Sequence, residues 1–269
     1  MTDEKRNLEA IRASSNDTLA QRDNRPVALV TGGARRVGLA IVQMLAAHGY
    51  RVAVHANTSL ADARRVVETI TTSGGEGLAL AADLRDETAL RRMIDAAHQH
   101  FGRLDALITS AAIWKPKPLE EIAAADVREH FEINALGTFV ACQHAGLIMA
   151  GQESGGAIVN IGDWAVVRPY VNYAAYFPSK GAIPTITRDL AVELARRNPR
   201  VRVNAILPGP VLLPADLPDA ERQASINATL VKREGRPENI AHAAFFLLEN
   251  DYVTGVCLPV DGGRSIYAG

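Results

Sequence analysis

A tyrosine and a lysine that could together move a proton stand four residues apart, at Tyr176 and Lys180. The segment has helical periodicity, and residues four apart on a helix share one face. A phenol titrates at about pH 10 in water, and a neighbouring ammonium group favours its ionised form, which would lower the pKa of Tyr176 towards neutrality. The spacing predicts an acid–base pair, but the same spacing also arises on ordinary helix surfaces, so its context must support the prediction.

A glycine-rich segment provides part of that context. It runs Thr31-Gly32-Gly33-Ala34-Arg35-Arg36-Val37-Gly38, after an apolar run and before a helical pattern. Such a turn places backbone N–H groups and the positive end of a helix beside a phosphate. A tight turn without a ligand is the alternative, but it gives no reason for two adjacent arginines, whereas phosphates do. We expect ligand contacts from Gly32, Arg35, Arg36, Val37 and Gly38.

The end of the next apolar run favours NADP over NAD as the ligand of this turn. The stretch from His55 to Ser59 has no carboxylate, the group that would bind an unsubstituted ribose and repel a 2′-phosphate. Arg35 and Ser59 are the candidate 2′-phosphate ligands, and we expect His55 and Asn57 to line the same edge of the cofactor. For Arg35, an exposed surface charge is the alternative.

The elements that must position these residues alternate along the chain from Arg25 onwards. Short apolar runs alternate with longer segments of helical periodicity, the pattern of repeated βαβ units. We predict one α/β domain over residues 25–269, a doubly wound seven-stranded parallel sheet flanked by helices, after a polar tail at residues 1–24. The predicted strands are Val27 to Thr31, Arg51 to His55, Gly77 to Ala82, Leu104 to Ile108, Ala157 to Ile161, Val201 to Ile206 and Val256 to Val260.

Two local features modify this pattern. The less regular stretch from Pro208 to Gly235 would lie at the carboxyl edge of the sheet, where it could form a lid over a substrate. Pro184 cannot donate to the Lys180 carbonyl and is expected to kink the helix that carries the pair.

Composition limits the possible partners. The 269 residues carry a net charge of −1, with a pI near 6.7, which gives no electrostatic reason to expect nucleic acid or an anionic membrane. The polar N-terminus lacks the apolar stretch of a signal peptide, and no apolar run reaches the roughly 18 residues that cross a bilayer. Neither Cys142 and Cys257 nor the seven histidines have metal-ligand spacing. We expect a cytoplasmic protein without metal or membrane contact.

These motifs, in this order, resemble the short-chain dehydrogenase/reductase family, with a Rossmann-like fold. The resemblance covers about residues 26–266 and includes the glycine turn, Asn134, Tyr176 with Lys180, Pro208-Gly209 and Asp261-Gly262-Gly263. It implies that Tyr176 exchanges a proton with substrate, that Lys180 binds the nicotinamide ribose, and that Asn134 holds a proton-relay water. It also implies a homotetramer, an adenine contact from Asp83, and further cofactor contacts from Leu84, Ser110, Ala111, Pro208, Gly209 and Val211.

Within the family, the chain looks like the pteridine reductases. Asp163 stands thirteen residues before the tyrosine, where most members carry serine, and Arg36 takes the place of the middle glycine. Trp114 matches an aromatic that stacks a flat pterin on the nicotinamide, which suits an indole. Ala112 and Thr58 depart from this subgroup, since they replace a substrate-contacting serine and an arginine that contacts the 2′-phosphate. Alternatives are that Trp114 anchors a loop on the core and that Asp163 caps a turn.

Three functions follow as hypotheses. The first is NADPH-dependent reduction of a C=N bond in a pterin-like or dihydrofolate-like heterocycle, with Arg36, Trp114, Asp163 and Tyr176 around the substrate. Asp163 favours it, because an ionised carboxylate only accepts hydrogen bonds and would repel the oxyanion formed from a ketone. The second is a carbonyl reductase of an acyl, sugar or steroid ketone. The third is a cofactor-binding sensor without turnover.

Overall fold

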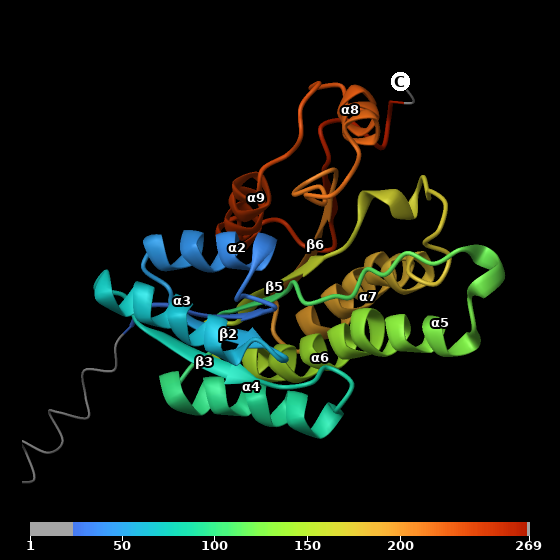
Figure 1. The fold of residues 1–269 in the computed structure, drawn as a ribbon. Helices are drawn as coiled ribbons and strands as arrows, with labels where there is room; N and C mark the ends of the chain where they lie inside the picture. The colour runs from blue at the N-terminus through green and yellow to red at the C-terminus, as the bar shows by residue number, and fades with distance from the viewer. Residues whose placement is uncertain (1–23, 268–269) are drawn as a thin grey trace, which may run out of the picture.

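The computed structural model describes residues 24–267, and a single parallel sheet forms its centre (Figure 1). Within these residues seven strands lie in the order β3-β2-β1-β4-β5-β6-β7, and all neighbouring strands are parallel. This confirms the predicted α/β fold, and every predicted strand boundary lies within two residues of an observed one. The strands are β1 (Val27–Thr31), β2 (Arg51–Ala56), β3 (Gly77–Ala81), β4 (Ala106–Thr109), β5 (Gly156–Ile161), β6 (Val201–Pro208) and β7 (Cys257–Val260).

Helices cover both faces of the sheet. One face carries α2 (Arg36–Ala47), α3 (Leu60–Thr72) and α9 (Pro237–Glu249), and the other carries α4 (Glu87–Phe101), α6 (Gly137–Ala150) and α7 (Phe177–Ala195). β1 shows the reason, because its side chains alternate between the faces. Ala28 and Val30 pack into the first layer, and Val27 and Leu29 pack into the second. All four are fully buried, which is why the strands read as continuous apolar runs.

A long apolar helical segment crosses the second layer. α5 (Ala124–His130), the π-helical turn η2 (Phe131–Leu136) and α6 are continuous over Ala124–Ala150, which is long and apolar enough by composition to span a membrane. Its packing explains that composition, because 56% of its apolar window is buried and α6 contacts α4, α7 and β5. A helix enclosed by a protein core needs apolar residues on several sides.

The candidate residues converge on one edge of the sheet. The strand order reverses between β1 and β4, and ligands of doubly wound sheets bind beside the carboxyl ends of the strands at such a point. Thr31 at the end of β1 pairs with Thr109 at the end of β4, so the glycine turn lies beside Ser110. β5 and β6 end at the same edge, and they bring Asp163 and Pro208 there.

The remaining segments are short. They are η1 (Leu119–Glu121), η3 (Trp164–Val166) and α8 (Asp219–Asn227). The irregular stretch after β6 contains α8, and an isolated bridge between Val211 and Gly235 joins its beginning to its end; its movement as a lid stays a prediction. α7 continues through Pro184 to Ala195, and both Tyr176 and Lys180 precede the proline. The predicted tail lies outside the described residues, apart from Asn24.

Candidate active site

Tyr176 and Asp163 are brought together by two different elements. Tyr176 is the N-cap residue of α7, and Asp163 lies between β5 and η3. The Tyr176 hydroxyl donates to Asp163 Oδ2 over 2.8 Å, and Asp163 Oδ1 accepts the N–H of Ala165 at 2.8 Å. The aspartate therefore does both things considered from the sequence: it caps a helical turn and it faces the tyrosine.

Burial sets the proton affinities of this group. It raises the pKa of Asp163, against the hydrogen bonds from Ala165 and Tyr176, which lower it. Burial and then the charge of Asp163 raise the pKa of Tyr176 above its ordinary value. The expectation that Lys180 brings the Tyr176 pKa towards neutrality is corrected, because burial, and then the adjacent carboxyl group, raise this pKa instead. The structure holds Tyr176 as a protonated donor.

Lys180 and Asn134 connect neighbouring elements to this pair. Burial lowers the pKa of Lys180 to about 8, and its Nζ donates to the carbonyl of Ile161 at 2.8 Å. Asn134 lies in the π-helical turn, and its Nδ2 donates to Ser179 Oγ at 3.1 Å. Ser179 Oγ donates in turn to the Tyr176 carbonyl at 2.6 Å. The Asn134 side chain thus positions the start of α7, and single π-helical turns of this kind often mark functional sites.

The buried side chain of His55 supports the glycine turn. Gly32 has a φ of +65°, and a Cβ there would lie 2.8 Å from the Ala111 Cα, so only glycine fits. The Gly32 N–H points at His55 Nδ1 over 3.3 Å, and His55 Nε2 lies 3.0 Å from the Ala82 carbonyl. His55 is 1% exposed, and burial lowers its pKa. This corrects the predicted cofactor contact: the neutral ring supports the turn from beneath.

The two arginines of the turn point in different directions. Arg35 forms an ion pair with Asp62 in the first turn of α3, beside Ser59, and its side chain is 67% exposed. Arg35 therefore lies near the predicted 2′-phosphate position, and its guanidinium group is already paired with the Asp62 carboxylate. Arg36 has a φ of +52°, a left-handed conformation that explains why a glycine is usual here. Arg36 Nη2 donates to the Leu212 carbonyl at 2.9 Å, which joins the turn to the segment after β6.

The predicted adenine contact also has a basic partner. Asp83 forms an ion pair with Arg85, and this contact holds the Asp83 pKa below its usual value, with a smaller contribution from Asn57. Asp83 and Asn57 thus lie together at the ends of β3 and β2. The side chain of Leu84 is 7% exposed and packs in the core, so only its main chain is left for a cofactor.

Backbone groups after β4 face the glycine turn. The N–H groups of Ser110 and Ala111 both donate to Thr31 Oγ1, over 3.1 and 3.2 Å. The Thr31 hydroxyl therefore holds the β4 loop against the turn, a role that its position in the sequence did not indicate. Val37, in the first turn of α2, packs against the core layer on that face.

Three aromatic residues next to Tyr176, namely Trp114, Tyr170 and Tyr173, form what we call the aromatic wall. Trp114 is 42% exposed and stacks on Tyr173, with ring centroids 4.8 Å apart and an interplanar angle of 13°. Tyr173 meets Tyr176 edge-on at 6.2 Å and Tyr170 at 5.0 Å. Trp114 is therefore not a buried loop anchor. Tyr170 and Tyr173 were not predicted as site residues, although tyrosines at every third position up to Tyr176 were a usable signal.

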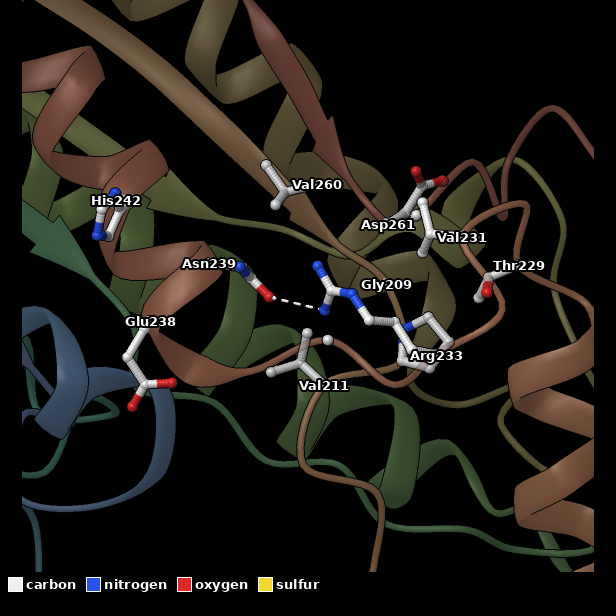
Figure 2. Close-up of a pocket in the computed structure, with 13 residues that line it drawn as sticks. Gly209, Val211, Thr229, Val231, Arg233, Glu238, Asn239, His242, Val260 and Asp261 are labelled. Atoms are coloured by element: carbon white, nitrogen blue, oxygen red, sulfur yellow. Dashed lines mark hydrogen bonds between the residues drawn. The ribbon is translucent and has the colours of Figure 1, made fainter.

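A cavity of about 360 Å³ lies behind the Pro208-Gly209 corner (Figure 2). Arg233 extends across it towards Asn239 of α9, and Gly209 and Val211 form one side. None of the catalytic residues lines it, so it is separate from the tyrosine site. At the corner itself, a Cβ on Gly209 would lie 2.4 Å from the Asp261 Cα, which explains the glycine there.

Hydride transfer involving a nicotinamide cofactor is the chemistry that this edge of the sheet supports, so the class is a Rossmann-like NAD(P)-dependent oxidoreductase. A family model described as enoyl-(acyl carrier protein) reductase matches residues 32–265, and the chain belongs to the short-chain dehydrogenase/reductase family.

Individual relatives agree with this assignment. The human 3-oxoacyl-[acyl-carrier-protein] reductase is 34% identical and the match covers 89% of this chain and 98% of that protein. The crystal structure of a blue fluorescent protein from a metagenomic library in complex with NADPH has a TM-score of 0.82 and 33% identity, covering 91% of this chain and 100% of that one. A short-chain dehydrogenase/reductase mutant from Serratia marcescens has a TM-score of 0.81 and 35% identity, covering 89% and 98%.

Proposed function

We propose that this enzyme reduces a carbonyl group of a small molecule with NADPH. When bound, NADPH supplies the hydride. The observation that carries the proposal is the hydrogen bond of 2.8 Å between Tyr176 and Asp163 beside Lys180. This geometry keeps the Tyr176 proton in place for the oxygen of a substrate carbonyl.

Burial raises the pKa of Asp163, which weakens the objection that an ionised aspartate repels an oxyanion. A carboxyl group that burial makes easier to protonate can donate a hydrogen bond, as the more usual serine does. In the structure both oxygens of Asp163 accept hydrogen bonds, from the Tyr176 hydroxyl and the Ala165 N–H, so Tyr176 is the O–H donor for a carbonyl oxygen. Such a donor stabilises the charge that develops on that oxygen in the transition state.

NADPH is the preferred cofactor in this proposal. The end of β2 has no carboxylate to repel a 2′-phosphate, and Arg35 lies beside Ser59 at that position. The glycine turn leaves no room for a side chain at Gly32, as close approach of a pyrophosphate requires. The related structure with bound NADPH supports the same choice.

The relatives favour a ketone over a pterin as substrate. The human relative bears the name of a 3-oxoacyl reductase, and that activity is a reduction of a ketone. Dihydropterin reduction, as in the pteridine reductases, is the second candidate. The stack of Trp114 on Tyr173 favours it, because a half-exposed indole beside Tyr176 offers a flat surface to a heterocycle.

A turnover comparison separates the candidates. NADPH oxidation is followed with a β-keto ester and with a 7,8-dihydropterin, using the wild-type enzyme and Asp163→Ser. We expect the keto ester to have the higher kcat/KM and the variant to retain ketone reduction, since serine is the usual donor. Faster dihydropterin turnover that Asp163→Ser abolishes would favour the second candidate. NADPH binding without oxidation of either mixture would favour a sensor.

Two further properties belong to the proposal. We propose a homotetramer, as the family resemblance implies, and a cytoplasmic location. Light scattering on the purified chain and fractionation of the source cells test them, and a monomer or a membrane-bound fraction would contradict them.

A further inference from the structure

Among the described residues, two arginines near Asp163 have no carboxylate partner. Arg168 lies five residues after Asp163, and Arg264 follows β7. Arg168 Nη1 donates to the Arg264 carbonyl at 3.2 Å and also to the Tyr267 carbonyl. Within residues 24–267, neither guanidinium group forms an ion pair. The two side chains therefore form one positively charged cluster.

The cluster is only partly exposed. Burial and the charge of Arg168 both lower the pKa of Arg264, which is what two neighbouring cations without a counter-ion produce. Arg264 Nε is buried and has no hydrogen-bond partner among the described residues. Lys232 adds a further positive charge beside the cluster. Its Nζ lies 4.5 Å from the ring centroid of Tyr267, the residue whose carbonyl accepts from Arg168. Arg264 Nη1 donates to the Ala228 carbonyl at 3.2 Å, a neutral partner, so an anion would still compensate these charges.

The aromatic wall connects this cluster to the catalytic tyrosine. The Arg264 guanidinium lies 5.0 Å from the ring centroid of Trp164, the residue directly after Asp163. Trp164 stacks on Tyr170 with centroids 6.5 Å apart, and Tyr170 meets Tyr173 at 5.0 Å. A chain of ring contacts therefore joins the arginines to the catalytic tyrosine; Trp164 in this chain is buried, and Tyr170 is 39% exposed. The glycine turn and Arg35 follow β1, whereas Arg168 follows β5 and Arg264 follows β7. Because β4 lies between β1 and β5 in the sheet, this cluster is separate from the cofactor phosphate site.

We propose that Arg168 and Arg264 form an anion subsite that binds a carboxylate or phosphate group of the carbonyl substrate. The inference rests on the proposed carbonyl reduction and narrows its substrate class. The reacting carbonyl lies at Tyr176, the body of the substrate lies along Tyr173 and Tyr170, and its anionic end reaches the guanidinium groups. Planar guanidinium groups bind carboxylate and phosphate oxygens through paired hydrogen bonds.

The test compares charged and neutral ketones. Straight-chain keto acids of increasing length and their methyl esters are assayed at saturating NADPH. We expect kcat/KM for the acid to exceed that for the ester by about tenfold at the length that spans the wall. Arg168→Gln and Arg264→Gln should each bring the ratio close to one through KM. Arg196→Gln is the matched control, because this exposed arginine follows the far end of α7, about 30 Å from Tyr176.

The outcomes separate this inference from the proposed function. A phosphorylated ketone and its free alcohol, assayed in the same way, distinguish a phosphate from a carboxylate group. Equal turnover of acids and esters by the wild-type enzyme overturns the subsite and leaves carbonyl reduction standing. An equal loss of kcat for acid and ester in Arg264→Gln also overturns it, because the arginine would then only brace Trp164. Failure to reduce any of these ketones overturns the proposed function itself.

Discussion

The pairing of Asp163 with Tyr176 makes a quantitative prediction about pH. Asp163 Oδ2 lies 2.8 Å from the Tyr176 hydroxyl oxygen, so ionising both groups places two negative charges side by side. With an effective dielectric constant of about 20, that repulsion is about 6 kcal/mol, or about four pKa units. Because the carboxylate charge is shared by two oxygens, we expect about half of this, roughly two units, to be lost in Asp163→Asn.

The direction in which the pH profile moves follows from the role of Tyr176 as a proton donor. Carbonyl reduction needs a protonated Tyr176, so the rate falls as pH rises through the Tyr176 pKa. Burial and then the charge of Asp163 raise that pKa, and removing the charge lowers it again. The basic limb of the kcat/KM profile should therefore move to lower pH in Asp163→Asn, by roughly two units.

The assay is the pH dependence of ketone reduction at saturating NADPH. Asp189→Asn is the control, because this exposed aspartate lies on the same helix about 20 Å further along, and its profile should match that of the wild type. Tyr176→Phe should be inactive at every pH. If the basic limb of the kcat/KM profile lies at the same pH in Asp163→Asn and in the wild type, the reasoning is refuted. The carboxylate would then have no part in holding the Tyr176 proton.

Other predictions concern stability and cofactor choice. Because burial lowers the His55 pKa, the free energy of unfolding should fall as pH drops below about 6.5, and urea titrations should show less of this fall in His55→Gln. Arg202 donates to three carbonyls at or just beyond the end of α9, so Arg202→Met should lower that free energy by about 3 kcal/mol, measured by urea unfolding. Asp62→Asn should release Arg35 and lower KM for NADPH by about threefold, with KM for NADH unchanged.

Local patterns were enough to predict the framework. The β1 run from Val27 to Thr31 is apolar at successive positions, and the glycines after it suit only a tight turn, so the strand and the turn follow from neighbouring residues alone. Tyr176 and Lys180 were found in the same way, because a spacing of four on a helix is a local property.

Contacts between distant segments could not be predicted in the same way. His55 was expected to touch a cofactor, but the sequence does not show that its ring packs under Gly32 with both nitrogens engaged. The stack of Trp114 on Tyr173 joins residues 59 positions apart, and nothing in either segment specifies the other.

The sequence by itself determined which elements form, their order, and which residue types stand at the ends of the strands, because secondary structure and turns depend on neighbouring side chains. Only the tertiary structure decided how those residues behave chemically. The Tyr176 pKa is raised where the sequence predicted that it would be lowered, because burial and the facing carboxyl group of Asp163 outweigh the lysine one turn away. Proton affinity depends on solvent exclusion and on the distances between charges, and both exist only once the chain has folded.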